Sequence, residues 1–243
     1  MKKLLCSIVL GLIVNLLPGP FSAISANRVD VTLYPEISEK YNAVKVGGEF
    51  RIMYCNAADT MKIIANDKVI ETIECVVEDG TLTVRYKKGK GAKAILGGKS
   101  PIVYIPADPR IEKMILSGTT RMTCLVPIVC KNFSLELSGT ARAVGEVKTT
   151  ELSIRCAGTV NVTLTGSSDA VDIRIDGASR VAMGEGFESK NANIDINGAG
   201  VVRINCKGKL TGEISGVSVV KYLGDPEVSI ITNGLASVTA ADK

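Results

Sequence analysis

The chain has 243 residues, a formal net charge of +4, no histidine, no tryptophan and only 4% aromatic residues. The lack of histidine excludes histidine catalysis and histidine metal sites. Removing residues 1–26 takes away two lysines and no acid, which lowers the charge from +4 to +2. A surface this close to neutral argues against a nucleic-acid partner. A core with so few large rings has to be built from valine, isoleucine and leucine, which suits stacked strands.

The first 26 residues have the three parts of a secretory signal peptide. Lys2 and Lys3 precede a mostly apolar run over residues 4–17, and small residues lead to a predicted cleavage site near Ala26. The apolar run is shorter than the roughly 20 residues of a transmembrane helix. Lipidation at Cys6 is the alternative, but this cysteine precedes most of the apolar run. We therefore expect an exported protein of the periplasm or the outer cell surface.

Residues 27–110 are predicted to form an irregular β-rich N-terminal half. Residues 66–77 fit either a short helix or a strand. The basic, glycine-rich stretch 87–99 is interpreted as a solvated loop, because no strand–loop–helix context supports a phosphate site there. Alternating residues and glycine or proline boundaries predict strands within 41–52, 82–86 and 100–106.

Residues 111–243 contain a repeat in which a small or polar residue is followed by glycine. Successive glycines are 21, 19, 19, 21, 18 and 18 residues apart. A period near 20 residues without a helical pattern is typical of a solenoid. The recurring pairs are Ser117-Gly118, Ser138-Gly139, Ala157-Gly158, Asp176-Gly177, Asn197-Gly198, Ser215-Gly216 and Asn233-Gly234.

Apolar residues recur two and four residues before each glycine, and four and six residues after it. The residues between them are mostly polar, so each repeat is predicted to hold two short strands with one face turned inward. The glycine supplies the positive φ that turns the chain between them. The position four residues before the glycine holds Met114, Leu135, Ile154, Ile173, Ile194, Gly212 and Ile230.

A meandering sandwich of hairpins is the alternative architecture, because Asp-Gly and Asn-Gly also form hairpin turns. A single repeat buries too few aliphatic side chains to offset the entropy of ordering its backbone. It therefore needs backbone pairing with the repeats above and below. The same apolar positions persist through all the repeats, which favours stacked coils over independent hairpins.

Residues 27–243 contain six cysteines, and an even number in an exported protein ordinarily suggests disulfides. No two of the cysteines within the repeats occupy the same position on neighbouring repeats, so we expect most of them to be buried thiols that fill the core. A bridge between Cys55 and Cys75 stays open at this point. The six are Cys55, Cys75, Cys124, Cys130, Cys156 and Cys206.

The sequence resembles a family of exported proteins of Bacteroidetes and their relatives, known as putative auto-transporter adhesin, head GIN domain. The resemblance covers nearly all of residues 40–240. It rests on the order of four motifs and on the repeated glycine turns; Ala157-Gly158 and Asn233-Gly234-Leu235 depart from the usual turn residues. The motifs are YNAVKVGGEFRIMY, DGTLTVRY, YIPADPRIEKMILSGTT and VVKYLGDPEV.

The resemblance implies an all-β fold, a right-handed single-stranded parallel β-helix or β-solenoid, with the less regular N-terminal half as part of one continuous fold. It also implies a periplasmic or surface location. It brings no established activity, because the word adhesin in the family name is itself a conjecture.

No catalytic, cofactor-binding or metal-binding residue is assigned from the sequence, and no cofactor is expected. Acidic residues were weighed because β-helical enzymes that act on polysaccharides use clusters of acids. Asp172 and Asp195 lie five and three residues before their glycines and so do not share a position, and Asp176 lies directly before its own glycine. Arg174 is predicted to stack against Asp195 as a cross-strand ion pair. The calcium-binding nonapeptide of other β-rolls does not occur.

Three classes of function remain. We expect a non-enzymatic binding or adhesion module, or a structural protein of the cell envelope, because the long polar faces of a solenoid suit extended partners. The alternatives are a carbohydrate-active β-helix enzyme and an envelope protein for signalling or stress sensing. Candidate partners are a polysaccharide, an envelope protein or a second copy of the chain. The last candidate follows from residues 237–243, which show no capping sequence over the final strand edge.

Overall fold

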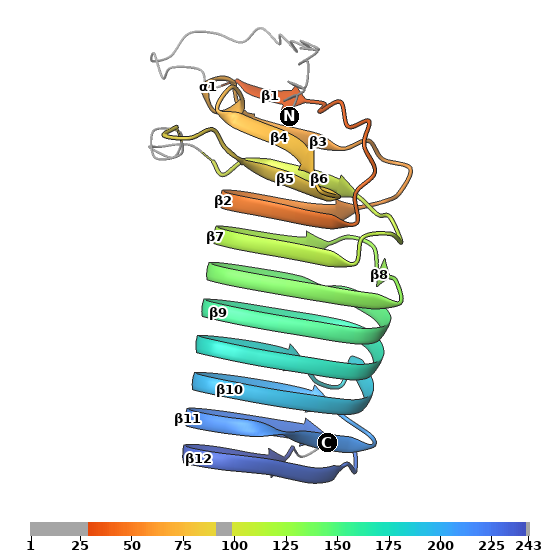
Figure 1. Cartoon of the computed structure of the whole chain (residues 1–243), viewed down its shortest axis with the longest axis vertical. Coiled ribbons are helices and arrows are strands. Elements are labelled where there is room, and N and C mark those ends of the chain that lie inside the picture. The colour runs from red at the N-terminus through yellow and green to blue at the C-terminus, as the bar shows by residue number, and fades with distance from the viewer. Residues whose placement is uncertain (1–28, 91–98, 242–243) are drawn as a thin grey trace, which may run out of the picture.

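The protein is a stack of β-coils, seen side-on in Figure 1. The computed structural model describes residues 29–90 and 99–241, so the predicted signal peptide and most of the predicted basic loop lie outside the described residues. No helix in those two ranges is long and apolar enough to cross a membrane. The strands are β1 (Asp30–Leu33), β2 (Ala43–Cys55), β3 (Lys62–Asn66), β4 (Ile73–Glu78), β5 (Thr81–Tyr86), β6 (Ile102–Pro106), β7 (Lys113–Cys124), β8 (Ile128–Val129), β9 (Asn132–Met183), β10 (Phe187–Asn205), β11 (Lys209–Leu223) and β12 (Glu227–Ala240).

The repeats stack in parallel and in register, which confirms the predicted β-solenoid and rules out the hairpin sandwich. Strands β7, β9, β10, β11 and β12 are successive neighbours in one sheet. Turn glycine pairs with turn glycine: Gly118 with Gly139, and Gly198 with both Gly177 and Gly216. Most inward positions predicted from the sequence are buried in the rungs before β12, whereas in β12 Ile230 and Val238 are only half-buried. Ile173, Ile194, Val181 and Val202 have no exposed surface, so each rung adds to one continuous core.

The turn glycines are required by two independent constraints. Each has a positive φ, for example +83° at Gly139, which L-residues rarely adopt. A β-carbon on Gly139 would also lie 2.6 Å from the carbonyl oxygen of Gly118 on the rung before. At this bend the backbone of one rung therefore lies directly against the backbone of the next, with no room for a side chain between them.

The regular stack begins earlier than the sequence repeat indicated. Strand β2 pairs in parallel with β7 along its whole length, and Gly48 pairs with Gly118. Val44 and Val46 lie before this glycine, and Ile52 and Tyr54 after it, at the same inward positions as in the later rungs. The repeat predicted from residue 111 therefore has an additional rung in β2, separated from the others by an insertion.

That insertion, residues 56–110, covers the N-terminal end of the stack. Strands β5 and β6 pair in parallel with the first and second parts of β2. Strands β3 and β1 continue from β6 in antiparallel order, and β4 pairs with β5. Residues 66–77, for which helix and strand were both considered, contain one of each: helix α1 (Asp67–Ile70) and strand β4.

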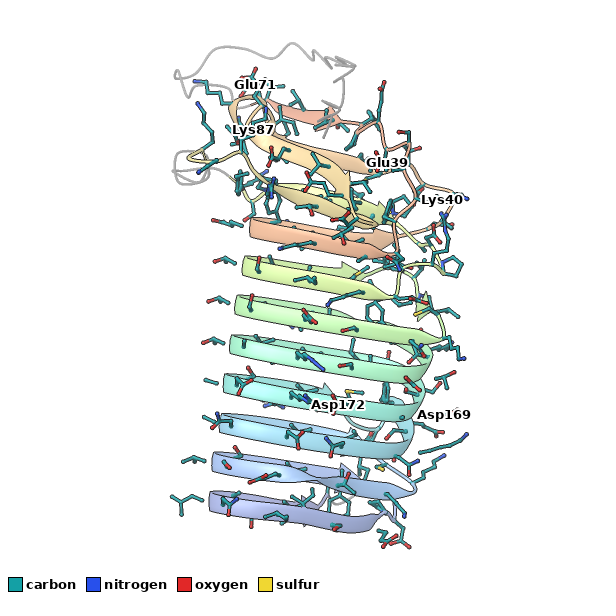
Figure 2. All side chains as sticks on the ribbon, viewed as in Figure 1. Glu39, Lys40, Glu71, Lys87, Asp169 and Asp172 are labelled. Carbon is teal, nitrogen blue, oxygen red and sulfur yellow. The ribbon has the colours of Figure 1, made fainter. Side chains whose placement is uncertain are left out.

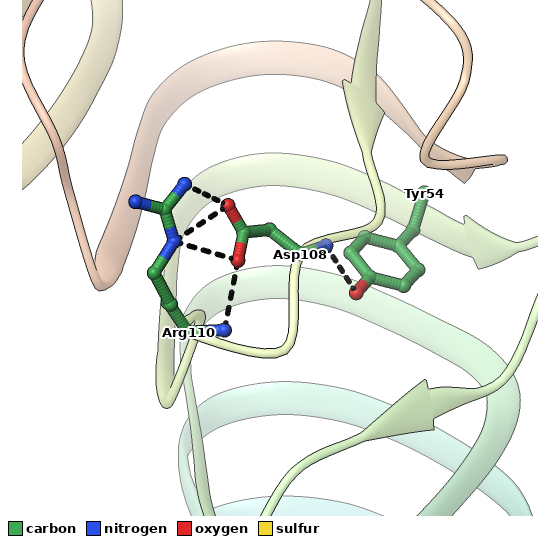
Figure 3. A network of polar contacts seen from close by, with 3 residues as sticks. All are labelled: Tyr54, Asp108 and Arg110. Carbon is green, nitrogen blue, oxygen red and sulfur yellow. Dashed lines mark hydrogen bonds and ion pairs between the residues drawn. The ribbon is translucent and has the colours of Figure 1, made fainter.

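A polar cluster holds the chain where it re-enters the stack between β6 and β7 (Figure 3). The hydroxyl of buried Tyr54 accepts a hydrogen bond from the Asp108 backbone N–H at 3.2 Å, and burial raises the pKa of Tyr54 to about 12. The Asp108 carboxylate accepts from Arg110 Nε at 2.9 and 3.0 Å, and the hydrogen bonds from Arg110 lower the pKa of Asp108. Asp108 and Arg110 flank Pro109, so the cluster holds the tight turn that leads into β7.

The structure contains no disulfide among the cysteines of residues 29–90 and 99–241, so Cys55 and Cys75 do not form a bridge. The Cys55 thiol donates a hydrogen bond to the Ile105 carbonyl at 3.5 Å. Burial raises the pKa of the Cys124 and Cys156 thiols to about 12. Cys55, Cys156 and Cys206 are buried, whereas Cys75, Cys124 and Cys130 are half-buried against the core, so the expectation of buried core-filling thiols holds for three of the six.

Candidate ligand-binding grooves

The coil presents two long outer faces that meet at the turn glycines. The first-strand face consists of the residues one, three and five positions before each glycine. The second-strand face consists of those one, three and five positions after it. Because every rung is in register, each of these positions forms a straight row of side chains along the stack, and some of these rows can be followed in Figure 2. A groove runs along each face.

The first groove, here called the polar groove, has a volume of about 980 Å³ and follows the start of the first strand through several rungs. Hydroxyl, amide and carboxyl side chains five residues before the glycine line its wall. Asp172 lies on this face, whereas Asp169 lies at the edge where the coil turns (Figure 2). The row consists of Lys113, Ser134, Ser153, Asp172, Asn193 and Thr211.

Side chains in the polar groove bind one another across rungs. Asn193 Nδ2 donates to Asp172 Oδ1 and to Asp195 Oδ2, both at 3.1 Å, and Thr211 Oγ1 donates to Asn193 Oδ1 at 3.2 Å. Arg174 Nε lies 3.8 Å from Asp195 Oδ2, which confirms the predicted cross-strand pair, and 3.4 Å from Asp172 Oδ2. Asp172 and Asp195 are thus brought together in one network, while Asp176 lies exposed beside its turn glycine.

The second groove, here called the arginine groove, has a volume of about 600 Å³ and follows the second-strand face. Arginines stand three residues after the turn glycine on neighbouring rungs: Arg51 pairs in register with Arg121, and Arg121 with Arg142. Asn161 holds this position on the next rung and Arg180 on the one after. All five side chains are exposed. Exposed Thr119, Thr140 and Thr159 line the same groove one residue after their glycines.

The arginines of this row lack the carboxylate partners that several basic residues elsewhere on the coil have. Lys113 pairs with Glu136 at 2.9 Å, and Lys190 with Asp169 and Lys207 with Glu188 at 2.8 Å. For Arg121, Arg142 and Arg180, no carboxylate of residues 29–90 or 99–241 lies within 4.0 Å. Like charges directly opposite one another destabilise a sheet. This row therefore carries a like-charge repulsion that no ion pair of the described residues offsets.

Two further polar groups line the arginine groove. Thr120 is only 4% exposed, and its Oγ1 has no hydrogen-bond partner. Thr120 stands two residues after its glycine, at an inward position that Ala141 and Val160 also occupy, so this hydroxyl faces the core and does not reach a ligand in the groove. At the N-terminal end of the groove, Glu49 Oε1 accepts a hydrogen bond from Ser100 Oγ at 2.8 Å. That contact engages the one acid among the groove's lining residues.

Sequence reasoning missed the arginine row because it weighed the acids before the glycine and not the residues after it. The signal was available, since the same alignment places Arg121, Arg142 and Arg180 three residues after Gly118, Gly139 and Gly177. Arg51 joins the row only once β2 is known to be a rung. Within the described residues, no group of three or more histidine, cysteine, aspartate or glutamate side chains is arranged to hold a metal ion.

Comparison with known families identifies the family of this chain. The model of the family described as putative auto-transporter adhesin, head GIN domain, matches residues 40–226. The chain belongs to this family. The match includes β2, the inserted cap and the rungs through β11, which contain both grooves. A comparison with curated proteins finds no match.

Solved structures share the fold. A putative adhesin from Bacteroides fragilis is 18% identical, with a TM-score of 0.79, and the match covers 89% of this chain and 98% of that one. A putative adhesin from Parabacteroides merdae is 21% identical, with a TM-score of 0.66 and coverage of 90% and 98%. A protein of the same fold from Parabacteroides distasonis, described as a putative lipid binding protein, is 13% identical, with a TM-score of 0.64 and the same coverage. At these identities the likeness establishes the fold alone.

Proposed function

We propose that this protein is a non-enzymatic binding module exported to the cell envelope, which holds an extended partner along the outer faces of its coil. The observation that supports this most directly is the arginine groove, a continuous surface with basic groups left unpaired on a rigid scaffold. Loosely packed surface charges adjust to one another. A row fixed by in-register strands keeps its geometry for an external partner, which lowers the entropy cost of binding.

Binding is favoured over hydrolysis by the contacts of the acids on the first-strand face. A glycosidase needs one carboxyl that donates a proton and a second that attacks or activates water. Here Asp172 and Asp195 share the amide of Asn193 and the guanidinium of Arg174. Both carboxylates therefore accept contacts within one cross-rung network, an arrangement that stabilises the stack.

An array of bacterial and host polysaccharides, probed with the mature protein, tests the proposal. We expect retention of at least one polymer, and no new reducing ends when the retained polymer is incubated with the protein. Cleavage that disappears in an Asp172→Asn variant would establish the enzyme alternative. Retention of no glycan, together with no binding to intact cells or envelope fractions, would refute the binding function.

Export is the second part of the proposal. It is supported by the signal-peptide pattern of residues 1–26 and by membership in an auto-transporter adhesin family. N-terminal sequencing of the protein from fractionated cells tests it, with an expected start just after Ala26. Digestion of intact cells with an added protease separates the surface from the periplasm. A full-length chain recovered in the cytosol would contradict export.

A further inference from the structure

We infer that the arginine groove is a binding site for an acidic polysaccharide that carries one carboxylate on each sugar. This inference rests on the proposed binding function and adds the chemical class of the ligand. The basis is the straight row of Arg51, Arg121, Arg142 and Arg180, which lines a groove of about 600 Å³ and includes Asn161 in the remaining place. That volume lies within the range typical of ligand sites.

The spacing of the row selects a polymer with closely spaced charges. Neighbouring strands of a sheet lie about 4.8 Å apart, so the row offers a cation at nearly every such step along the stack. One pyranose ring of an extended polysaccharide spans a similar length, so a sugar chain whose successive rings turn their carboxylates to the same side would match the row. An acidic peptide in extended form presents side chains on one side only every second residue, about 6.8 Å apart, and would lose register with the arginines within a few rungs.

The side chains suit carboxylates on a sugar backbone. A guanidinium group binds a carboxylate through two parallel hydrogen bonds, and the amide of Asn161 donates to a carboxylate as well. Exposed Thr119, Thr140 and Thr159 form a row parallel to the arginines, two residues closer to the turn glycine, and can exchange hydrogen bonds with sugar hydroxyls. The groove thus pairs charge recognition with hydroxyl recognition along one line.

Nucleic acid fits the same groove less well. Sites for single strands combine a basic groove with exposed aromatic rings on which bases stack. The aromatic residue that lines this groove, Phe50, is 1% exposed and belongs to the core. The net charge of +2 after removal of residues 1–26 also gives little long-range attraction for a polyphosphate.

Titration calorimetry of the mature protein with a decamer of galacturonic acid tests the inference. The comparison ligands are the fully methyl-esterified decamer, a heparin fragment of equal length, an oligothymidylate and a polyglutamate peptide. We expect the free-acid decamer to bind more tightly than each of these, with an affinity that falls as salt is raised. Tighter binding of heparin, oligothymidylate or polyglutamate would overturn the inference in favour of that polymer.

The decisive variant is Arg121→Gln/Arg142→Gln, and the matched control is Arg155→Gln, an exposed arginine on the first-strand face. We expect the double variant to lose about a hundredfold in affinity, about 2.7 kcal/mol, and the control to be unchanged. Arg121→Lys/Arg142→Lys keeps the charge without the planar fork and should lose less than the glutamine pair. Because removal of like charges relieves repulsion, the double variant should melt no lower than the wild type, so the lost affinity cannot be ascribed to unfolding.

The possible results separate this inference from the proposed function. Equal binding of the methyl ester, or full affinity in Arg121→Gln/Arg142→Gln, would overturn the arginine groove as the site. If the protein retains only neutral polysaccharides on the array, the binding function stands and the carboxylate inference is wrong. If it retains no polymer and binds no envelope fraction, both are wrong.

Discussion

The two outer faces of the coil are built by the same repeat, but they differ in whether their charged side chains are paired with one another. On the first-strand face, Asp172, Asn193, Asp195 and Arg174 bind one another across rungs. In the arginine row of the second-strand face, Arg121 lies in register with Arg51 and Arg142, and no carboxylate among the described residues lies within 4.0 Å of Arg121 or Arg142. The inward positions specify the fold, so the outward rows are free to vary. A paired row stabilises the stack, whereas an unpaired row of one charge costs stability and points to a partner outside the chain.

The largest effect on stability is expected from a substitution at the bend that separates the two faces. Gly139→Ala places a β-carbon 2.6 Å from the Gly118 carbonyl oxygen in a residue with φ of +83°. We expect a loss of about 2–4 kcal/mol in the free energy of unfolding, because backbone cannot yield as a flexible side chain can. Urea unfolding followed by circular dichroism measures it. Gly89→Ala, at a glycine with positive φ but open surroundings, is the control and should lose only about 1 kcal/mol.

The next prediction concerns the interior shared by both faces. The Cys156 thiol is buried with a pKa of about 12 against an ordinary value of 9.0. Below pH 9 the thiol is protonated in both states and contributes no pH dependence. Between pH 9 and 12 the unfolded thiol ionises while the folded one does not, so stability falls. Cys156→Val removes this loss and should be about 1–3 kcal/mol more stable relative to wild type at pH 11 than at pH 7.

Denaturant midpoints of the two proteins at pH 7, 9 and 11 check this prediction. Tyr54 and Tyr86, which also have pKa values raised to about 12 by burial, keep a residual slope in the variant. Parallel pH profiles for wild type and Cys156→Val would mean that the thiol reaches solvent in the folded state.

A third prediction compares an asparagine of the hydrogen-bonded network on the first-strand face with the exposed asparagine of the arginine row. Asn193→Ala removes two donated hydrogen bonds to carboxylates and one accepted from Thr211, so we expect a loss of about 1–2 kcal/mol. Asn161→Ala removes an exposed amide from the arginine row and should change stability by less than about 0.5 kcal/mol. Thermal melts of both variants measure the difference. Equal losses would mean that the network contributes no more than the exposed amide.

The sequence was sufficient for the architecture of the regular rungs and insufficient for its starting point. Apolar periodicity and the turn glycines predicted most of the buried residues between 111 and 223, because both are local requirements of a stacked strand; in β12, which has a neighbouring strand on one side only, the same positions are half-buried or exposed. The rung in β2 has the same pattern around Gly48, but 70 residues separate that glycine from Gly118. The insertion of residues 56–110 removes the regular spacing by which a repeat is recognised, and only the register of β2 with β7 restores it.

The grooves were harder to predict than the fold. The pairing of Arg174 with Asp195 followed from their shared position three residues before the glycine, as both the alignment and the structure place them. The participation of Asn193 did not follow, because it depends on side-chain directions within a row. The unpaired state of Arg142 could not be predicted either. It depends on the absence of acids from neighbouring rows, and those rows are known only once all rungs are aligned.

The smallest expected effect is also the most direct test of the difference in charge. Arg174→Gln removes contacts to two carboxylates and should lower stability by about 0.2–0.5 kcal/mol, because exposed ion pairs are worth little. Arg142→Gln removes a like-charge neighbour of Arg121 and should raise stability by a similar amount. Opposite signs are the essential outcome, and both effects should shrink in 1 M salt, where charges are screened within about 3 Å. If Arg142→Gln instead lowers stability and salt does not change that loss, the arginine row is held by packing, and repulsion can no longer be used to argue for an external ligand.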